Sequence, residues 1–300
     1  YVAPERFTPG FLRSLRDVDI RLLAIDEAHC LSQWGHDFRP DYLRLGRVRE
    51  ALGCPPTAAL TATATPAVQE DILRTLGVLD AKRFVLGFDR DNLALEVIDT
   101  PKEADKLALL PDLVQGGTTL IYCATRKHVE KVAAHLHGAG IHAGTYHGGM
   151  DMNARKHIQD EFMSGRVRVV VATNAFGMGV DKDDVRCIVH YEIPGTVEAY
   201  YQEIGRAGRD GRPSRVVLLF REGDRRTQEF FIQMAHPPAS HVRAVYTTLL
   251  EHPTDEVWIT HEELAEKVQR SRTGCDDLNE RTVASCIYLL QREGWLRRLS

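Results

Sequence analysis

Several signals of secreted, zinc-binding and membrane proteins are missing from this sequence of 300 residues. Its six cysteines are scattered and form no CxxC pair, which argues against a disulfide framework and a zinc knuckle. No apolar run reaches the roughly 18 residues that a membrane-spanning helix requires, and no signal-peptide pattern opens the chain. The net charge of −4 gives no overall attraction to nucleic acid, so a site of that kind requires local clustering of basic residues. A reducing cytoplasm, without a membrane partner, is therefore the expected setting.

Short apolar segments rich in β-branched residues alternate with segments of helical periodicity. Strands buried on both faces read as nearly continuous apolar runs, so this alternation predicts an α/β fold with parallel sheets covered by helices. Residues 88–100 are interpreted as a connector, and helices replace strands after residue 220. The expected strands are residues 21–25, 58–61, 118–123, 167–173, 185–191 and 215–220, and the expected helices are residues 66–76, 127–138, 154–164 and 197–207.

The acidic pair Asp26-Glu27 directly follows the expected strand at residues 21–25. Folds of this class bind ligands at the carboxyl ends of their strands. An Asp in this place can hold Mg²⁺ through water, while the neighbouring Glu polarises a water molecule that attacks a phosphate. The alternative is a helix-capping carboxylate beside a solvated Glu. Two features favour the functional interpretation: His29, which completes the sequence DEAH, and the hydroxyl-rich sequence TAT at residues 61–63 after the next strand.

Seven other blocks accompany DEAH along the chain. They are YVAPERF at residues 1–7, SQWGHDFRP at 32–40, ALTATAT at 59–65, FDRDNL at 88–93, YHGGM at 146–150, VVVATNAFGMGVDK at 169–182 and YYQEIGRAGRDG at 200–211. DEAH after a strand resembles the second nucleotide motif of superfamily-two helicases. With the aromatic-rich block directly behind it and the other blocks in order, the sequence resembles the RecQ family of DNA helicases over roughly residues 1–222.

The resemblance implies two RecA-like α/β domains, with residues 1–88 as the second half of the first domain and residues 89–222 as the second domain. Residues 223–300 would then form a small helical or winged-helix domain that binds DNA. ATP and Mg²⁺ are the implied cofactors, and single-stranded and duplex DNA are the implied partners. The implied activity is ATP-dependent unwinding in the 3′ to 5′ direction, in DNA repair and recombination.

By the same resemblance, two groups of residues contact DNA. The aromatic loop behind the acids would stack bases on the side chains of Trp34, His36, Phe38 and Arg39. Stacking contributes about 1–3 kcal/mol per base, so a loop in this place can report bound DNA to the hydrolytic centre. Packing in an ordinary core is the alternative for the two large aromatic rings. The second group, Thr125 and Arg126, would grip the DNA backbone, since a hydroxyl and a helix N-terminus suit an anion.

The block at residues 200–211 carries arginines on or just after a helix that Thr196 can cap. The resemblance places Arg206 and Arg209 at the γ-phosphate and implies Gln202 as a further catalytic residue. Arg209 would be the arginine finger, which stabilises charge in the transition state. A solvated basic face and a contact with DNA phosphates are the alternatives. Two further arginines are therefore left unassigned, Arg212 and Arg215.

The block at residues 169–182 contributes the remaining residues expected to bind the nucleotide. Gly177 and Gly179 let a ligand approach the backbone closely, because glycine has no Cβ. The resemblance places Asp181 near the ribose or in the network around the arginine finger.

Two features of the RecQ family are missing. No segment matches GxxxxGK[ST] and no Gly-Lys dipeptide occurs, so the loop that holds the β- and γ-phosphates is absent from these 300 residues. We therefore expect this chain by itself to be inactive in ATP hydrolysis. Only Cys275 and Cys286 follow residue 220, which is too few for a four-cysteine zinc module, so no zinc is expected.

Helical patterns stand in the place of the zinc module. They cover residues 225–235 and 240–251, followed by a capping box at residues 260–263 and a helix that Asn279 caps. Residues 295–299 are expected to form a strand, which completes the helix–helix–strand order of a winged helix. A purely structural helical domain is the alternative.

Two other functions stay open. One is an RNA helicase of the DEAH kind, against which the aromatic loop argues. The other is a non-enzymatic DNA-binding or regulatory module that has lost its phosphate loop.

Overall fold

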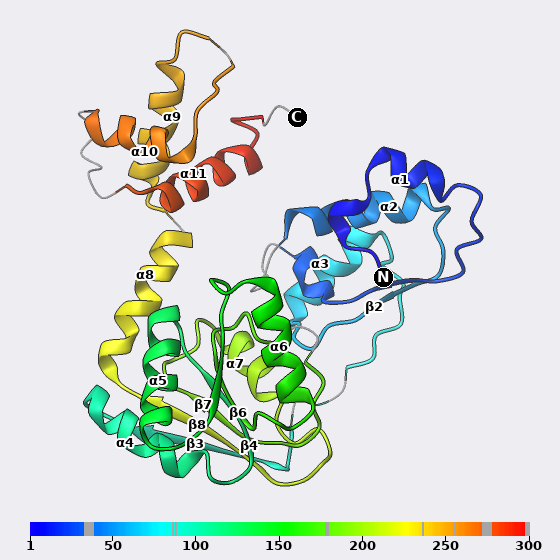
Figure 1. Ribbon diagram of the computed structural model, residues 1–300. Helices are drawn as coiled ribbons and strands as arrows, with labels where there is room; N and C mark the ends of the chain where they lie inside the picture. Colours follow the sequence, from blue (N-terminus) through cyan, green and yellow to red (C-terminus); the bar gives the residue numbers. More distant parts are fainter. Residues whose placement is uncertain are drawn as a thin grey trace. The chain divides into compact units, whose positions relative to one another are not determined.

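The computed structural model describes residues 1–32, 39–85, 87, 89–177, 180–235, 237–254, 256–271 and 278–297. The chain separates into two compact units, Tyr1–Phe220 and Arg221–Ser300 (Figure 1). The first unit contains two parallel sheets with their helices, and the described part of the second unit is helical. The predicted α/β fold with parallel sheets is therefore confirmed. None of the helices in the described part of the chain is long and apolar enough to cross a membrane.

Residues 1–85 contain a small two-stranded sheet. β1 (Leu23–Ile25) and β2 (Thr57–Ala59) pair in parallel, and Ile25 joins one core with apolar residues of α2 (Leu45–Ala51) and α3 (Pro66–Leu76). The Thr65 hydroxyl caps α3, and Gly77 ends it in the left-handed conformation that glycine adopts without strain. The short helices of this part are η1 (Pro4–Arg6), α1 (Pro9–Ser14), η2 (Ala28–Leu31) and η3 (Pro40–Arg44).

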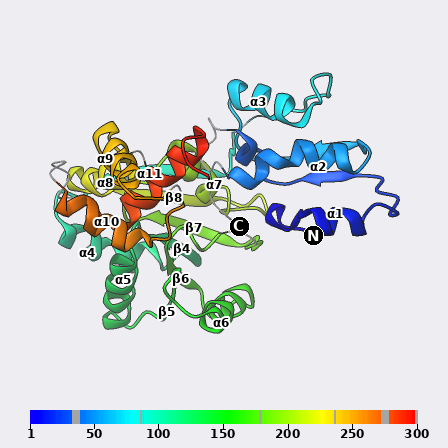
Figure 2. The same cartoon turned by 90° about the horizontal axis from the view of Figure 1, so that it is seen from above.

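A six-stranded, all-parallel sheet follows, with the strand order β3-β8-β7-β4-β6-β5. Figures 1 and 2 show it from two directions. Its strands are β3 (Leu93–Asp99), β4 (Thr118–Tyr122), β5 (Ala143–Tyr146), β6 (Val169–Ala172), β7 (Val185–His190) and β8 (Ser214–Phe220). Its helices are α4 (Glu103–Leu113), α5 (Arg126–Gly138), α6 (Met152–Met163) and α7 (Val197–Ile204).

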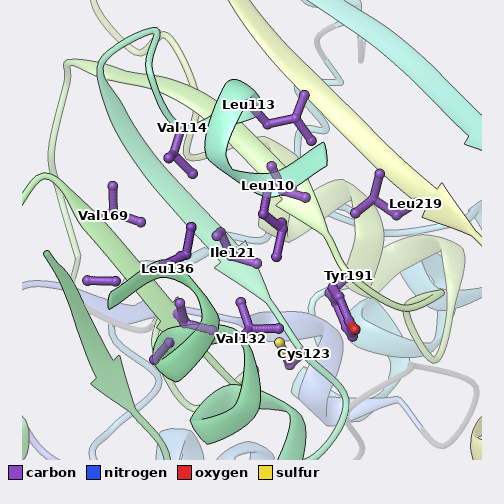
Figure 3. Close-up of a cluster of buried hydrophobic side chains, with 14 of the residues drawn as sticks. Leu110, Leu113, Val114, Ile121, Cys123, Val132, Leu136, Val169, Tyr191 and Leu219 are labelled. Atoms are coloured by element: carbon purple, nitrogen blue, oxygen red, sulfur yellow. The ribbon is translucent and has the colours of Figure 1, made fainter. Parts of the chain in front are cut away.

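Successive residues of the central strands pack against different helices. Ile121 of β4 joins a core with Leu110 of α4 and with apolar residues of α5 (Figure 3). Its neighbour Leu120 joins a second core with Phe162 of α6 and with residues of α7. Because successive side chains of a strand point to opposite faces, helices cover the sheet on both sides. This double burial accounts for the nearly continuous apolar sequence of the central strands.

The interpretation of residues 88–100 as a connector is wrong, because residues 93–99 form strand β3. All seven of its residues pair in parallel with β8 at the edge of the sheet. An edge strand has only one neighbour, and its side chains at Leu95 and Val97 are 59% and 66% exposed. Glu96 interrupts the apolar run that marks the central strands, and Asp99 ends it. The pairing of this strand at the edge depends on β8, more than one hundred residues later, so the local sequence pattern did not distinguish it from a loop.

The second unit begins with the short η4 (Glu222–Asp224) and contains α8 (Arg225–Ala235), α9 (Ala239–Leu250), α10 (His261–Arg270) and α11 (Glu280–Arg292). The last three helices share a core that includes Val245, Val268 and Cys286. The predicted capping box is present: Glu263 N donates to Thr260 Oγ1 at 3.2 Å, and Thr260 N donates to Glu263 Oε2 at 2.9 Å. Asn279 caps α11 as predicted, since its Oδ1 accepts from Thr282 N at 3.1 Å.

The strand expected at residues 295–299 does not form over residues 295–297, and residues 298–300 lie outside the described residues. Instead, Trp295 N donates to Leu290 O at 2.8 Å, and the Trp295 ring packs edge-on against Tyr246. The chain thus turns back on α11 after Gly294, which has a φ of +79°, and Leu296 packs against the core of the second unit, whereas Trp295 stays 63% exposed. The winged-helix domain stays a prediction.

Candidate nucleotide and nucleic-acid site

The acidic turn begins where β1 ends. Glu27 adopts the left-handed conformation, with φ of 50° and ψ of 43°. Asp26 Oδ1 accepts a hydrogen bond from Glu27 N at 2.9 Å. A non-glycine residue in this conformation costs about 1–3 kcal/mol, and such strain persists only where the surrounding structure enforces it, as it does at many functional sites. The turn places both carboxylates at the carboxyl end of β1.

His29 joins the acidic turn to the TAT segment. Its ring is buried, and Nδ1 lies 2.9 Å from Thr61 Oγ1 and 3.3 Å from Glu27 Oε2. The Thr61 hydroxyl donates to Thr63 O at 3.1 Å and accepts from Thr63 N at 3.3 Å. The loops that follow β1 and β2 are therefore connected through one buried imidazole.

Part of the predicted aromatic loop lies outside the described residues, namely Trp34, His36 and Phe38. The residues on either side of it are described. Ser32 Oγ donates to Asp71 Oδ2 at 2.8 Å, and Arg39 N donates to Cys30 O at 3.2 Å. Both ends of the loop are thus attached close to η2, which carries His29.

Thr125 and Arg126 stand at the start of α5, directly beyond the end of β4. Thr125 Oγ1 caps the helix by accepting from His128 N at 3.2 Å. The Arg126 guanidinium lies against the YHGGM block, because a Cβ at Gly149 would lie only 2.8 Å from Arg126 Nη1. A helix start, a hydroxyl and a guanidinium are therefore close together, and each of these groups favours a phosphate.

A carboxylate that the sequence analysis missed supports this helix start. Glu192 follows β7, and its side chain is only 1% exposed. Its Oε2 accepts from Ala124 N at 2.8 Å, and its Oε1 lies 2.7 Å from His128 Nδ1. This hydrogen bond to Glu192 raises the pKa of His128. The available signal was an acidic residue directly after a buried strand, the same signal that marked Asp26.

The arginines expected at the γ-phosphate lie in the loop after α7. The helix expected to reach residue 207 ends at Ile204, because the glycines of the sequence GRAG favour turns. Arg206 Nη1 donates to Gly177 O at 2.5 Å, and Arg209 forms an ion pair with Asp181. A Cβ at Gly177 would lie 2.5 Å from Arg206 Nη2, so the open side of this glycine, expected to face a ligand, faces Arg206.

Arg206 and Arg209 have different environments. Arg206 Nε is buried and has no hydrogen-bond partner among the described residues. The Arg209 side chain is 36% exposed, and that of its partner Asp181 is 78% exposed. Gln202 lies on α7 and is partly buried, whereas Gly179 lies outside the described residues. Arg209 is thus the arginine of the pair with more access to solvent.

The two unassigned arginines also differ. Arg215 Nη2 lies 2.8 Å from Glu96 Oε2, so this pair bridges β8 and β3. Arg212 is largely exposed, with Nε 3.9 Å from Asp210 Oδ2. In the part of the chain that the structure describes, no group of three or more His, Cys, Asp or Glu side chains is arranged to hold a metal ion.

Comparisons with known proteins agree with these observations. Residues 105–211 match the family described as the helicase conserved C-terminal domain. The chain is 44% identical over 253 residues to a probable ATP-dependent DNA helicase RecS of Bacillus subtilis, covering 83% of this chain and 51% of that protein. It is 43% identical over 240 residues to the ATP-dependent DNA helicase RecQ of the same organism, covering 78% and 40%.

Among solved structures, Saccharomyces cerevisiae Dbp5 bound to RNA and ADP BeF3 matches with a TM-score of 0.59 and 25% identity, covering 75% of this chain and 61% of that one. The chain spans about half the length, or less, of the curated relatives it matches. Over the part that it spans, this chain belongs to the RecQ-type DNA helicases and contains their helicase C-terminal domain.

Proposed function

We propose that the protein containing this chain is an ATP-dependent helicase that unwinds duplex DNA in the 3′ to 5′ direction, in repair and recombination. The observation that carries this proposal is the connection of the acidic turn to the TAT segment through His29, whose Nδ1 lies 2.9 Å from Thr61 Oγ1. It is supported by the similarity to proteins named ATP-dependent DNA helicases. We also propose a cytoplasmic protein whose residues 223–300 hold no zinc, since these residues contain only two cysteines, Cys275 and Cys286.

Asp26 and Glu27 are proposed to serve the hydrolytic step. Asp26 is exposed at the end of β1, and one of its oxygens already accepts from Glu27 N. A single accessible carboxylate suits Mg²⁺, which keeps several waters and takes its other ligands from substrate phosphates. The ion, when bound, neutralises charge on the phosphates. Glu27 orients the attacking water, and the left-handed turn with the contact to His29 holds this carboxylate in place.

Arg209 is proposed as the arginine finger. Its partner Asp181 is exposed, and an ion pair between accessible groups contributes little free energy, so a phosphate can replace Asp181. Arg206 turns inward to Gly177 O and holds the loop against the block at residues 169–182. Gly177, Gly179 and Asp181 are proposed to line the nucleotide, and Gln202 to act beside the two arginines.

DNA is proposed to bind through two surfaces. Thr125 and Arg126 contact backbone phosphates at the start of α5, where the helix dipole, the capping hydroxyl and the guanidinium act together. The aromatic loop stacks bases on Trp34, His36 and Phe38, and Arg39 adds a positive charge at the end of the loop. The attachment of Arg39 N to Cys30 O would transmit DNA binding to the acidic turn.

DNA is preferred over RNA as the substrate. The relatives named DNA helicases are 43–44% identical to this chain, whereas the RNA-bound structure of Dbp5 is 25% identical. ATP hydrolysis by the full-length protein should therefore be stimulated by single-stranded DNA at least tenfold more than by RNA of the same sequence. A Glu27→Gln variant should bind ATP and fail to hydrolyse it, because the amide cannot activate water.

Equal stimulation by RNA would favour an RNA helicase of the DEAH kind. DNA binding by a full-length protein without any hydrolysis would favour the non-enzymatic DNA-binding module. In either case the proposed function would be wrong.

A further inference from the structure

The sequence FDRDNL at residues 88–93 contributes two side chains to the loop that carries the arginines. Arg90 Nη2 donates to Ala207 O at 3.0 Å and to Gly208 O at 2.9 Å. Asn92 Nδ2 donates to Gly208 O at 2.8 Å and to Arg212 O at 3.0 Å. These contacts join residues more than one hundred positions apart in the sequence. Three of them end on the backbone of Ala207 and Gly208, the two residues that separate Arg206 from Arg209, and the fourth ends on Arg212 O.

The loop has little freedom at this point. Gly208 has a φ of +55°, and its own N donates to Val185 O at 2.9 Å. A Cβ at Gly208 would lie 2.4 Å from Asn92 Nδ2 and 2.8 Å from Ser214 Oγ. Ala207 is fully buried. The inner side of the loop is therefore filled by Asn92 and its neighbours, and the Arg209 side chain is left on the accessible side.

The two donors also hold each other in place. Arg90 Nε lies 3.4 Å from Asn92 Oδ1, and Asn92 O accepts from Ser214 N at 2.9 Å, where β3 and β8 begin to pair. Both carbonyl contacts come from Nη2, and Nε of the same guanidinium faces Asn92 Oδ1, so one planar group presents these donors as a rigid fork. A lysine has no such fork and would hold the loop less firmly.

We propose that Arg90 and Asn92 are positioning residues for Arg209, and that they fix the Ala207–Gly208 backbone so that the finger is held ready for the phosphate. This inference rests on the proposed function of Arg209. Its physical basis is that a group acting on the transition state must be placed accurately, since a displacement of about 1 Å can lower the rate about a hundredfold. Arg90 and Asn92 act through the backbone and do not touch the nucleotide.

The test uses the full-length protein with Arg90→Lys and, as a second variant, Asn92→Ala. Each should lower the kcat of DNA-stimulated ATP hydrolysis by about tenfold or more, with the KM for ATP and the Kd for DNA changed less than twofold. In an Arg209→Ala background, Arg90→Lys should cause no further loss of kcat, because the group it positions is already gone. Glu96→Gln is the matched control: it removes a contact between β3 and β8 that does not touch the loop, and kcat should stay within twofold.

Thermal unfolding of each variant separates positioning from a loss of fold. The inference would be overturned if Arg90→Lys lowered kcat further in the Arg209→Ala background. It would also be overturned if the loss of kcat in each variant equalled its fraction of unfolded protein. Arg90 and Asn92 would then have only a structural role. Normal kcat for Arg90→Lys and Asn92→Ala, with a large loss for Arg209→Ala, would overturn the positioning role while the finger stands. Normal kcat for Arg209→Ala would overturn both the finger and the inference.

Discussion

At the scale of single residues, two arginines are candidates for different phosphates, and their surroundings separate them. Arg209 pairs with the exposed carboxylate of Asp181 in a loop after α7. Arg126 lies against Gly149 at a helix start whose first hydroxyl is Thr125. The first arrangement can exchange one anion for another. The second offers a phosphate several donors that are already in place.

Arg209→Ala is expected to lower kcat by at least about a hundredfold while ATP and DNA affinities change little, because the finger acts on charge that develops only in the transition state. Arg126→Ala should instead weaken DNA binding for all sequences and flatten the log–log salt dependence by roughly one unit. Steady-state ATPase assays and salt-titrated DNA binding of the full-length protein measure the two effects. If Arg209→Ala kept a normal kcat and lost only DNA affinity, the loop would be a DNA-binding face.

At the scale of elements, α5 begins beside a pair of acidic residues. His128 faces Glu192 at 2.7 Å and Glu103 at 4.0 Å, and Lys131 lies 2.7 Å from Glu103. The pKa of His128 is raised, chiefly by the hydrogen bond to Glu192, so folding favours its protonated form. This contribution to stability is complete below the ordinary value of 6.5 and is lost as the pH rises through the raised value.

The free energy of unfolding should therefore fall as the pH rises above about 6.5, and His128→Gln should remove this part of the decline. Urea denaturation at a series of pH values between about 6 and 9 provides the measurement. His135→Gln is a suitable control, because it removes an imidazole from the last turn of the same helix. If the free energy of unfolding fell with pH at the same slope in the native protein and in His128→Gln, the pair of His128 and Glu192 would contribute nothing to the pH dependence of stability.

The elements differ in how far the sequence predicted them. Central strands such as β4 and β6 were predictable, because burial on both faces favours a nearly continuous run of apolar and β-branched residues. β3 was not, since Glu96 interrupts its apolar run and its pairing at the sheet edge depends on β8, more than one hundred residues later. The contact of Trp295 with Tyr246 depends on tertiary packing, which no local pattern encodes.

The candidate site also combines features that the sequence predicted with features that depend on tertiary structure. The closeness of the DEAH turn and the TAT segment followed from the rule that loops after neighbouring parallel strands lie at one edge. The roles of Glu192 and Arg90 did not follow from any rule of this kind. Each acts on a backbone far away in the sequence, at Ala124 and at Ala207, and such a contact is known only when the strand order is known.

At the scale of the whole molecule, these 300 residues contain the acidic turn and the arginine loop but no GxxxxGK[ST] sequence. The chain spans 51% of the RecS relative. We expect the 300 residues by themselves to show no DNA-stimulated ATP hydrolysis, since they contain no GxxxxGK[ST] loop to bind the β- and γ-phosphates of ATP. The full-length protein, if it carries such a loop, should hydrolyse ATP. Robust hydrolysis by the 300 residues would mean that another segment binds the phosphates.

The pairing of β3 with β8 has a mechanical consequence. The chain enters the six-stranded sheet at Leu93 and leaves it at Phe220, on adjacent parallel strands whose seven residue pairs are in register. The entry lies at the amino ends of the two strands and the exit at their carboxyl ends, so tension between these two points pulls the strands past each other lengthwise. All the hydrogen bonds of the pair then share the load, whereas bonds that are peeled apart break one after another. A sheet joined in this way resists stretching between Leu93 and Phe220.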